Sequence, residues 1–485
     1  MLIKRDFYIN GQWVAPAVPR DCQVINPSTE DPCAVISLGG QADTDAAVAA
    51  AKAAFPAWSA TPPAMRRRLV AAILDQYNAR LQEFAEAIAM EMGAPIDFAM
   101  SDQAPCLPWH TTNFLHAFDQ IEWVRPLGPH APGSAVVLEP IGVVGLITPW
   151  NWPVNQIALK AIPAMLAGCT CVLKPSEESP LNAMLFAEFC HDAGIPAGVF
   201  NLVNGDGAGV GAQLSTHPDV EMISFTGSTR AGRAISKAAA DTLKRVTLEL
   251  GGKGANLLFA DADARAVERS VRRMMENTGQ SCNAPSRLLV ERSVYEQTVT
   301  KAAEVAASIK IGPATVAGSH IGPVVNKRQW DQIQGYIQTG IDEGARLVAG
   351  GPGLPEGFNR GFYVQPTVFA DVAPGMTIEK EEIFGPVLAI IPFDTEAEAV
   401  QIANDTPYGL ANYVQTTDAA RANRLGRQLR SGMVEMNGKS RGAGSFFGGV
   451  KQSGRAREGG VWGLEEFLEA KAISGYDFGL DSAAE

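Results

Sequence analysis

The amino-acid sequence of 485 residues lacks the features that mark membrane, secreted and nucleic-acid-binding proteins. No apolar run approaches the roughly 18 to 20 residues that a membrane-spanning helix needs. The first residues, MLIKRDFYINGQW, contain neither the apolar segment nor the cleavage site of a secretory signal. Lysine and arginine form no long run, and the net charge is -12, which disfavours binding to a phosphate backbone. We therefore expect a cytoplasmic protein that binds neither a membrane nor a nucleic acid.

Cysteine and histidine are scarce, and neither is spaced like a metal site. The seven cysteines are an odd number, form no CxxC pair and have no zinc-like spacing to the six histidines. Free thiols in a reducing compartment fit this pattern best, and we expect no metal. Cys169 and Cys171 alternate in an apolar strand-like run, which predicts two buried, inert thiols.

Composition and periodicity predict a globular α/β protein of two or three domains. Hydrophobic residues make up 46% of the chain and charged residues 19%, with no internal repeat or low-complexity tract. Residues 43–59 and 65–92 have apolar side chains at helical spacing. From Gly142 onward, short β-branched runs alternate with helical ones, and a second such pattern follows Gly251. Two lobes with a cleft between them are expected, with Cys282 in the second lobe.

Two glycine-containing turns are candidates for a phosphate site. In LVNGDGAGVGAQL, Gly207, Gly209 and Ala212 loosely fit the dinucleotide pattern GxGxxA, although an ordinary turn explains the segment equally well. The better candidate is FTGSTRAG, in which Gly227 and Ser228 would offer backbone N–H groups to a pyrophosphate at a helix N-terminus. A plain serine cap is the alternative there.

The strand-like segment TCVLKP is followed by polar and charged residues at its carboxyl end, among them Lys174, Ser176 and Glu177. Ligands of parallel sheets bind at this edge. A carboxylate there can accept both hydroxyl groups of an adenosine ribose and would repel a 2′-phosphate. Glu177 therefore favours NAD over NADP, with a solvated loop glutamate as the alternative.

Two further residues are candidates for catalysis. Asn151 lies between two tryptophans in the proline-bounded turn TPWNWP, where a rigid amide donor would stabilise an oxyanion; ordinary turn chemistry is the alternative. Glu249 ends a strand before two glycines in LELGGK, so its carboxylate would project into the cleft. Desolvation there would raise its pKa toward that of a general base, whereas the plain alternative is a carboxylate that caps the next element.

Cys282 lies in ENTGQSCNAPSR, where neither a core nor a disulfide obviously explains it. Gly279, Gln280 and Ser281 predict a turn that exposes the thiol, and local amides there would favour the thiolate. The alternative is a small residue that merely fits. No histidine is adjacent in the sequence to form a protease-like pair. The histidines are His110, His116, His130, His191, His217 and His320.

Seven motifs occur in an order that resembles the NAD(P)-dependent aldehyde dehydrogenase superfamily, in its hydrolytic form: TPWNWP, LKPSEESP, FTGSTRAG, LELGGK, TGQSC, EEIFGPV and FGGVKQSGR. They span residues 148–455, and the likeness extends over nearly the whole chain. The resemblance implies a Rossmann-type cofactor domain, an α/β catalytic domain and a small β oligomerisation element that forms a homodimer or homotetramer. The corresponding ranges are 1–120 with 141–250, then 251–450, and 121–140 with 466–485.

The resemblance also implies a reaction and its residues. Cys282 would attack the aldehyde to form a thiohemiacetal, whose oxyanion is held by Asn151 and the Cys282 backbone N–H. After hydride transfer to NAD, water activated by Glu249 would hydrolyse the thioester, with Lys160 assisting near it. Glu382 would bind the nicotinamide ribose. The other residues expected at the cofactor are Trp150, Lys174, Ser176, Glu177, Gly207, Gly211, Phe225, Gly227, Ser228, Leu250 and Phe384.

Two rival functions remain from the sequence. A CoA-acylating relative would pass the acyl group to CoA, but such members commonly lack the glutamate that Glu249 represents here. A catalytically idle binding relative should have lost part of the set formed by Asn151, Glu249 and Cys282, yet all three are present.

The substrate itself stays open at this point. Gln156 and Asn283 indicate a more polar tunnel than a fatty aldehyde would prefer. Lys439 and Arg441 in the loop NGKSRGAGSFF either meet a substrate carboxylate or are surface cations. Candidates for the entrance are Trp109, His110 and Phe114.

Overall fold

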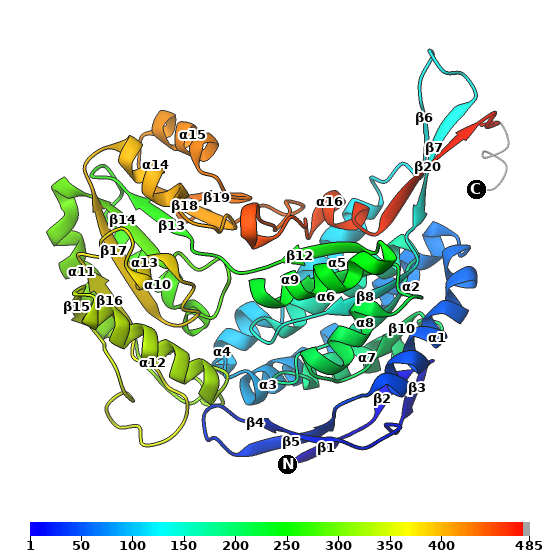
Figure 1. Ribbon diagram of the computed structural model, residues 1–485, viewed down its shortest axis with the longest axis horizontal. Helices are drawn as coiled ribbons and strands as arrows, with labels where there is room; N and C mark the ends of the chain where they lie inside the picture. Colours follow the sequence, from blue (N-terminus) through cyan, green and yellow to red (C-terminus); the bar gives the residue numbers. More distant parts are fainter. Residues whose placement is uncertain (479–485) are drawn as a thin grey trace.

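The computed structural model describes residues 1–478 and contains two seven-stranded sheets, one in each half of the molecule (Figure 1). Both sheets are mostly parallel, as the alternation of strand-like and helical segments predicts. Residues 479–485, at the end of the predicted oligomerisation element, lie outside the described range.

The first sheet has the strand order β12-β11-β8-β9-β10-β2-β3. Its parallel strands are buried along most of their length because helices pack on them and exclude water. The strands are β2 (Phe7–Ile9), β3 (Gln12–Val14), β8 (Val143–Ile147), β9 (Thr170–Lys174), β10 (Phe200–Leu202), β11 (Met222–Thr226) and β12 (Arg245–Glu249). The helices of this sheet are α1 (Gln41–Ser59), α6 (Pro153–Ala167), α7 (Leu181–Asp192), α8 (Ala212–Thr216) and α9 (Thr229–Ala239).

Strand register aligns the carboxyl ends of β8, β9, β11 and β12. Ile147 pairs with Lys174 and with Phe225, and Thr226 pairs with Glu249. Because parallel strands that pair in register end together, the segments that follow these four strands meet at one edge of the sheet.

The second sheet has the order β15-β16-β17-β14-β13-β18-β19 and is parallel except at β15. Its strands are β13 (Ala255–Leu258), β14 (Arg287–Glu291), β15 (Arg346–Ala349), β16 (Thr367–Ala370), β17 (Val387–Phe393), β18 (Ala411–Gln415) and β19 (Met433–Met436). Its helices are α10 (Ala266–Met275), α11 (Tyr295–Ser308), α12 (Lys327–Asp342), α13 (Thr377–Lys380), α14 (Glu396–Asn404) and α15 (Ala419–Gln428).

Two three-stranded sheets lie outside these halves. One consists of β6 (Val124–Pro126), β7 (Ser134–Pro140) and β20 (Leu468–Ser474), and it projects as an arm at the upper right of Figure 1, next to α16 (Gly460–Glu465). The other consists of β1 (Leu2–Lys4), β4 (Asp21–Ile25) and β5 (Pro32–Ser37), which run along the lower edge. The arm exposes an unpaired strand edge, which is a template for pairing with another chain.

The N-terminal helices differ in one place from the sequence prediction. The helix expected over 65–92 is two helices, α2 (Pro63–Ala79) and α3 (Leu81–Glu91), because Arg80 has the non-helical angles φ -126 and ψ 21. The break lets both apolar faces reach one core. Two further helices, α4 (Ile96–Phe98) and α5 (Cys106–Phe118), follow and approach the cleft.

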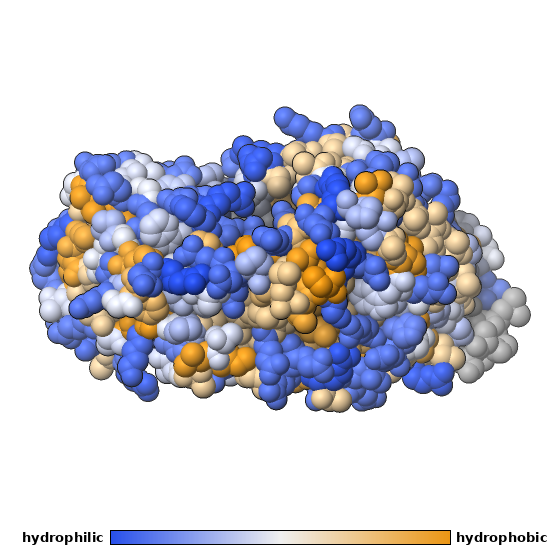
Figure 2. Space-filling view, turned by 90° about the horizontal axis from the view of Figure 1, so that it is seen from below, coloured by the Kyte–Doolittle hydropathy of each residue, from blue (hydrophilic) through white to orange (hydrophobic). Residues whose placement is uncertain are grey.

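Hydrophilic side chains are spread over the face seen in Figure 2, and the most hydrophobic ones form small separate groups there. Within residues 1–478, no helix combines the length and the apolar character that crossing a bilayer requires. The same residues include no cluster of three or more histidine, cysteine, aspartate or glutamate side chains that is placed to hold a metal ion.

A buried arginine ties together the core beneath the cleft. Arg287 begins β14, five residues after Cys282, and its side chain is fully buried. It donates to the carbonyl oxygens of Lys253, at 2.8 Å, and Ala403, at 3.0 Å, and forms an ion pair with Glu379 at 3.2 Å. Removing the guanidinium would leave several buried carbonyl groups without a donor and would leave Glu379 with Lys380 and the Gly375 N–H as its partners.

We expect Arg287→Met to lower the free energy of unfolding by about 3 kcal/mol, because it removes the buried partner of Glu379 and the donor that several buried carbonyl groups share. Urea titration followed by circular dichroism measures the change. Arg292→Met is the matched control, since Arg292 forms an exposed ion pair with Asp394 that water screens. Equal midpoints for the two variants would contradict the prediction.

Candidate active site

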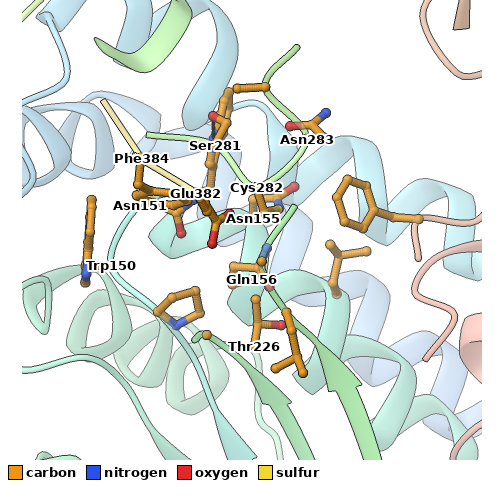
Figure 3. A pocket seen from close by; sticks show the side chains of 18 of the residues that line it. Trp150, Asn151, Asn155, Gln156, Thr226, Ser281, Cys282, Asn283, Glu382 and Phe384 are labelled. Atoms are coloured by element: carbon orange, nitrogen blue, oxygen red, sulfur yellow. Dashed lines mark hydrogen bonds between the residues drawn. The ribbon is translucent and has the colours of Figure 1, made fainter. Parts of the chain in front are cut away.

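The carboxyl edge of the first sheet faces a loop of the second half across a cleft pocket of about 710 Å³. The turn after β8 contributes Trp150 and Asn151, and the turn after β11 contributes Ser228. Cys282 and Glu382 come from the opposite half. Figure 3 shows Trp150 and Phe384 on one side of Cys282 and Asn283 on the other. Of the predicted residues, the lining contains Trp150, Asn151, Gly227, Ser228, Leu250, Cys282, Glu382 and Phe384.

The loop that carries Cys282 makes an unusual turn. Asn277, Thr278 and Gly279 have φ angles of 51°, 57° and 70°, so three successive residues are left-handed. At Gly279 a side chain would overlap the carbonyl group of Gly385, which only glycine avoids. This turn reverses the chain after α10 and presents Cys282, half-buried, to the pocket.

Hydrogen bonds join this loop to the turn that carries Asn151. The Asn151 Nδ2 donates to the Gln280 carbonyl oxygen at 2.9 Å, and the Asn277 Nδ2 donates to the Asn151 carbonyl oxygen at 2.9 Å. Gln103 adds a bond to the Asn277 Oδ1 at 2.8 Å. The Asn151 amide thus donates one N–H to the loop, and its other N–H has no partner within residues 1–478; Asn151 and Cys282 both line the pocket.

The environment of Cys282 opposes the thiolate. Burial raises the pKa of its thiol well above the ordinary range, and the carboxylates of Glu382, Glu249 and Glu458 raise it further. A backbone N–H lowers the pKa, as the expectation about local amides holds, but burial and the three acidic groups outweigh it and the net shift favours the thiol.

Glu249 lies at the end of β12 and is almost fully buried. Neither carboxylate oxygen has a hydrogen-bond partner within residues 1–478. Burial raises its pKa well above the usual value, and Glu458 raises it further, while Lys160 opposes the shift. A carboxylate with a raised pKa and two unused acceptors has the properties of a general base.

Lys160 lies behind the pocket wall and not in it. Its Nζ forms a buried ion pair with Glu458 and donates to the Thr226 hydroxyl group at 2.6 Å and to the Gln156 Oε1 at 3.3 Å. Thr226 and Gln156 themselves line the pocket, so Lys160 reaches it through them. Glu458 went unnoticed in the sequence, since no motif there marks it as a partner of Lys160.

Comparison with known proteins identifies the family of the chain that carries this site. The profile described as the aldehyde dehydrogenase family matches residues 13–473. The chain belongs to the aldehyde dehydrogenase family. The resemblance drawn from the seven motifs is thereby confirmed, and the enzyme oxidises an aldehyde with NAD.

Relatives of this aldehyde dehydrogenase cover almost the whole chain. A Pseudomonas 3-succinoylsemialdehyde-pyridine dehydrogenase is 49% identical and aligns over 98% of this chain and 99% of its own. A crystal structure of a Bartonella henselae aldehyde dehydrogenase is 58% identical, with a TM-score of 0.97, over 98% of this chain and 100% of that one. A cysteine-to-alanine mutant of Pseudomonas syringae aldehyde dehydrogenase C, solved with NAD+ and octanal, is 48% identical, with a TM-score of 0.96, over 98% and 97%. The predicted fold class is confirmed.

An acid, two aromatic rings and two cations line the part of the dehydrogenase pocket next to the sheet edge. Glu382 lies where a side chain on Gly251 would overlap it, so glycine keeps this wall open. The Trp150 and Phe384 rings are perpendicular, with centroids 5.5 Å apart. Arg230 and Arg328 also line the pocket and form no ion pair within residues 1–478, which suits the charge of a pyrophosphate. The sequence reasoning missed both arginines, because single exposed cations carry no pattern.

Several predicted cofactor contacts lie beyond this pocket. Lys174 is buried, donates to the Gly205 carbonyl oxygen at 2.7 Å and lies 3.4 Å from the Glu177 carboxylate. Ser176 is buried beside them. Phe225 packs beneath Gly227, where a side chain on the glycine would meet its ring.

Local hydrogen bonds involve both residues expected at the pyrophosphate. The Gly227 N–H donates to the Glu249 carbonyl oxygen at 3.0 Å, so the expectation that it is free for a pyrophosphate is wrong. The Ser228 hydroxyl oxygen caps α9 by accepting from the Ala231 N–H at 3.2 Å, as the serine-cap alternative holds. In the segment Gly207–Gly211, the Asp206 carboxylate accepts from the Gly209 N–H, which favours the ordinary-turn explanation there.

We expect the affinity for NAD to fall as the pH falls through 7. Burial raises the pKa of Glu382 to about 7, and its carboxylate accepts from the Gly252 N–H at 2.8 Å. Below that pH the carboxyl is protonated and accepts hydrogen bonds from the ribose hydroxyl groups less well. The Kd should therefore be about 10-fold higher at pH 6 than at pH 8. Quenching of tryptophan fluorescence by NAD measures the Kd.

The Glu382→Gln variant should bind NAD with little pH dependence in the same titration. Glu356→Gln changes a carboxylate on an exposed loop and should keep the wild-type profile. A pH dependence that survives in Glu382→Gln would contradict this assignment.

Proposed function

We propose that Cys282, Asn151 and Glu249 carry out the oxidation, and that the product is a free carboxylic acid. The observation that carries the proposal is the bond from Asn151 Nδ2 to the Gln280 carbonyl oxygen, which places an amide donor two residues from the thiol. A donor held in this way stabilises the oxyanion formed when Cys282 adds to a carbonyl carbon. Bound NAD supplies the acceptor for the hydride that leaves the thiohemiacetal carbon, and a thioester on Cys282 remains.

Glu249 is proposed to activate the water that hydrolyses this thioester. Its raised pKa and its two unbonded oxygens support a base that accepts a proton from water. Lys160, paired with Glu458, is proposed to stabilise the negative charge of Glu249, which the carboxylate loses when it accepts a proton and regains when it releases it. A buried base at the end of β12, next to the pocket-lining Leu250, disfavours both rivals, because acyl transfer to CoA and idle binding require none.

We propose NAD rather than NADP as the cofactor in use. The support is Glu177, whose carboxylate lies beside Lys174 at the sheet edge and would repel a 2′-phosphate. The remaining expected contacts to the adenosine half, including Ser176, Gly207 and Gly211, stay predictions.

Larger-scale features of the enzyme also remain proposals. We infer a homodimer or homotetramer, supported by the projecting arm of β6, β7 and β20, and a cytoplasmic location. We propose that residues 1–120 and 141–250 bind NAD, that residues 251–450 form the catalytic domain, and that residues 121–140 and 466–485 join subunits. The substrate is an aldehyde within the range of its relatives, which includes a pyridine semialdehyde and octanal.

We expect Glu249→Gln to slow thioester hydrolysis by at least about 100-fold, because the general base is lost. NADH should appear in a first burst near one equivalent per subunit and then slowly, and intact-mass spectrometry should detect the acyl group on Cys282. Glu356→Gln, on an exposed loop, is the control and should keep the wild-type rate. An unchanged steady rate in Glu249→Gln would show that hydrolysis uses another base.

We expect Glu177→Gln to raise kcat/KM with NADP by about 10-fold relative to NAD, because the repulsion of the 2′-phosphate is removed. Steady-state absorbance at 340 nm with both cofactors measures the ratio. Glu178→Gln is the matched control, since the neighbouring carboxylate accepts from the Asn326 Nδ2 instead. If both variants keep the wild-type ratio, Glu177 does not select the cofactor.

A further inference from the structure

Beyond Cys282, the pocket wall is formed by three elements that do not contact the cofactor side. Helix α5 contributes Trp109 and His110, α6 contributes Asn155 and Gln156, and the loop after β19 contributes Arg441. An aldehyde bound at Cys282 would extend its remaining atoms along this wall. The polar groups here therefore decide which substrates fit.

The two amides on α6 present N–H groups to the pocket. His110 Nε2 lies 2.7 Å from the Asn155 Oδ1, and burial lowers the pKa of His110 to about 3, so the ring is neutral. Facing an oxygen, Nε2 carries the proton and donates. The Gln156 Oε1 likewise accepts from the buried Lys160 ammonium. Both amide oxygens are occupied, and within residues 1–478 both NH2 groups remain free of protein partners.

Arg441 adds a guanidinium with unused donors. It lines the pocket and packs over the Phe447 ring at 4.9 Å, yet it forms no hydrogen bond or ion pair within residues 1–478. Arg273, on the same wall, is paired with Glu276. Glu435 and Cys282 affect the pKa of Arg441 only through charge at longer range, without a hydrogen bond. A half-buried guanidinium without a partner is energetically unfavourable until an acceptor reaches it.

We propose that the substrate is an aldehyde whose far end carries a second oxygen acceptor, a ketone or carboxylate oxygen, bound by Arg441 with the amides of Asn155 and Gln156 along the way. Arg441 and the NH2 groups of Asn155 and Gln156 are free donors on this wall, so an oxygen acceptor satisfies them and a hydrocarbon tail leaves them unpaired. Lys439, two residues away, is exposed and does not line the pocket. This inference rests on the proposed role of Cys282 as the residue that receives the aldehyde.

The test compares hexanal, 5-oxohexanal and glutaric semialdehyde, whose chains have the same number of non-hydrogen atoms from the aldehyde carbon to the far end. NADH formation gives kcat/KM for each. We expect the wild type to prefer the better acceptor aldehyde over hexanal by about 10- to 100-fold, the range expected for hydrogen bonds to a charged group. The acceptor that shows the larger effect identifies the group as ketone or carboxylate.

Arg441→Met should reduce this preference to within about threefold, and Arg441→Lys should restore part of it, because lysine keeps a charge but loses the fork of donors. Lys439→Met is the matched control and should keep the wild-type preference. Equal kcat/KM for the three aldehydes in the wild type, or a preference that survives in Arg441→Met, would overturn the proposal.

Binding to a Cys282→Ala variant separates this inference from the catalytic assignment. Calorimetric titration of the three aldehydes, with NAD present, needs no turnover. A binding order that follows the acceptor and disappears in Cys282→Ala/Arg441→Met supports the inference even if the kinetic tests contradict the roles of Cys282 and Glu249. Equal binding of the three aldehydes overturns it even if catalysis proceeds as proposed.

Discussion

The hydrogen bond from Asn151 Nδ2 to the Gln280 carbonyl oxygen is the interaction on which the active site depends. It joins a turn of the first sheet to the loop of the second half that carries the thiol, and Asn277 returns a bond in the opposite direction. Together with the bonds from Gln103 to Asn277 and from Trp152 to Ser281, this pair fixes the Asn151 turn relative to the loop that carries Cys282.

The second constraint is the burial of several acidic groups around the pocket, which raises their pKa values. The pocket excludes enough water to raise the pKa of Cys282, Glu249 and Glu382 together, since each charged form loses solvation and faces other acids. A protonated thiol is a weak nucleophile, and a carboxylate with a raised pKa accepts a proton more readily. The buried ion pair of Lys160 and Glu458 offsets part of the accumulated negative charge.

Much of the fold was predictable because its signals are local. Buried strands give continuous apolar runs, and the segments that follow parallel strands must share an edge, which is where the strands before Asn151 and Glu249 end. The errors arose where local signals compete with distant packing. The 65–92 helix breaks at Arg80 so that both parts reach one core, and the Gly227 N–H is taken by a neighbouring strand.

The sequence by itself determined the family, because seven motifs occur in the order that is typical of it. Tertiary structure decided the rest, since burial and partners depend on residues far apart in the chain. It paired Lys160 with Glu458, 298 positions away. It also turned Arg441 into the pocket and left Lys439 in solvent, although one loop carries both cations and nothing in their sequence separates them.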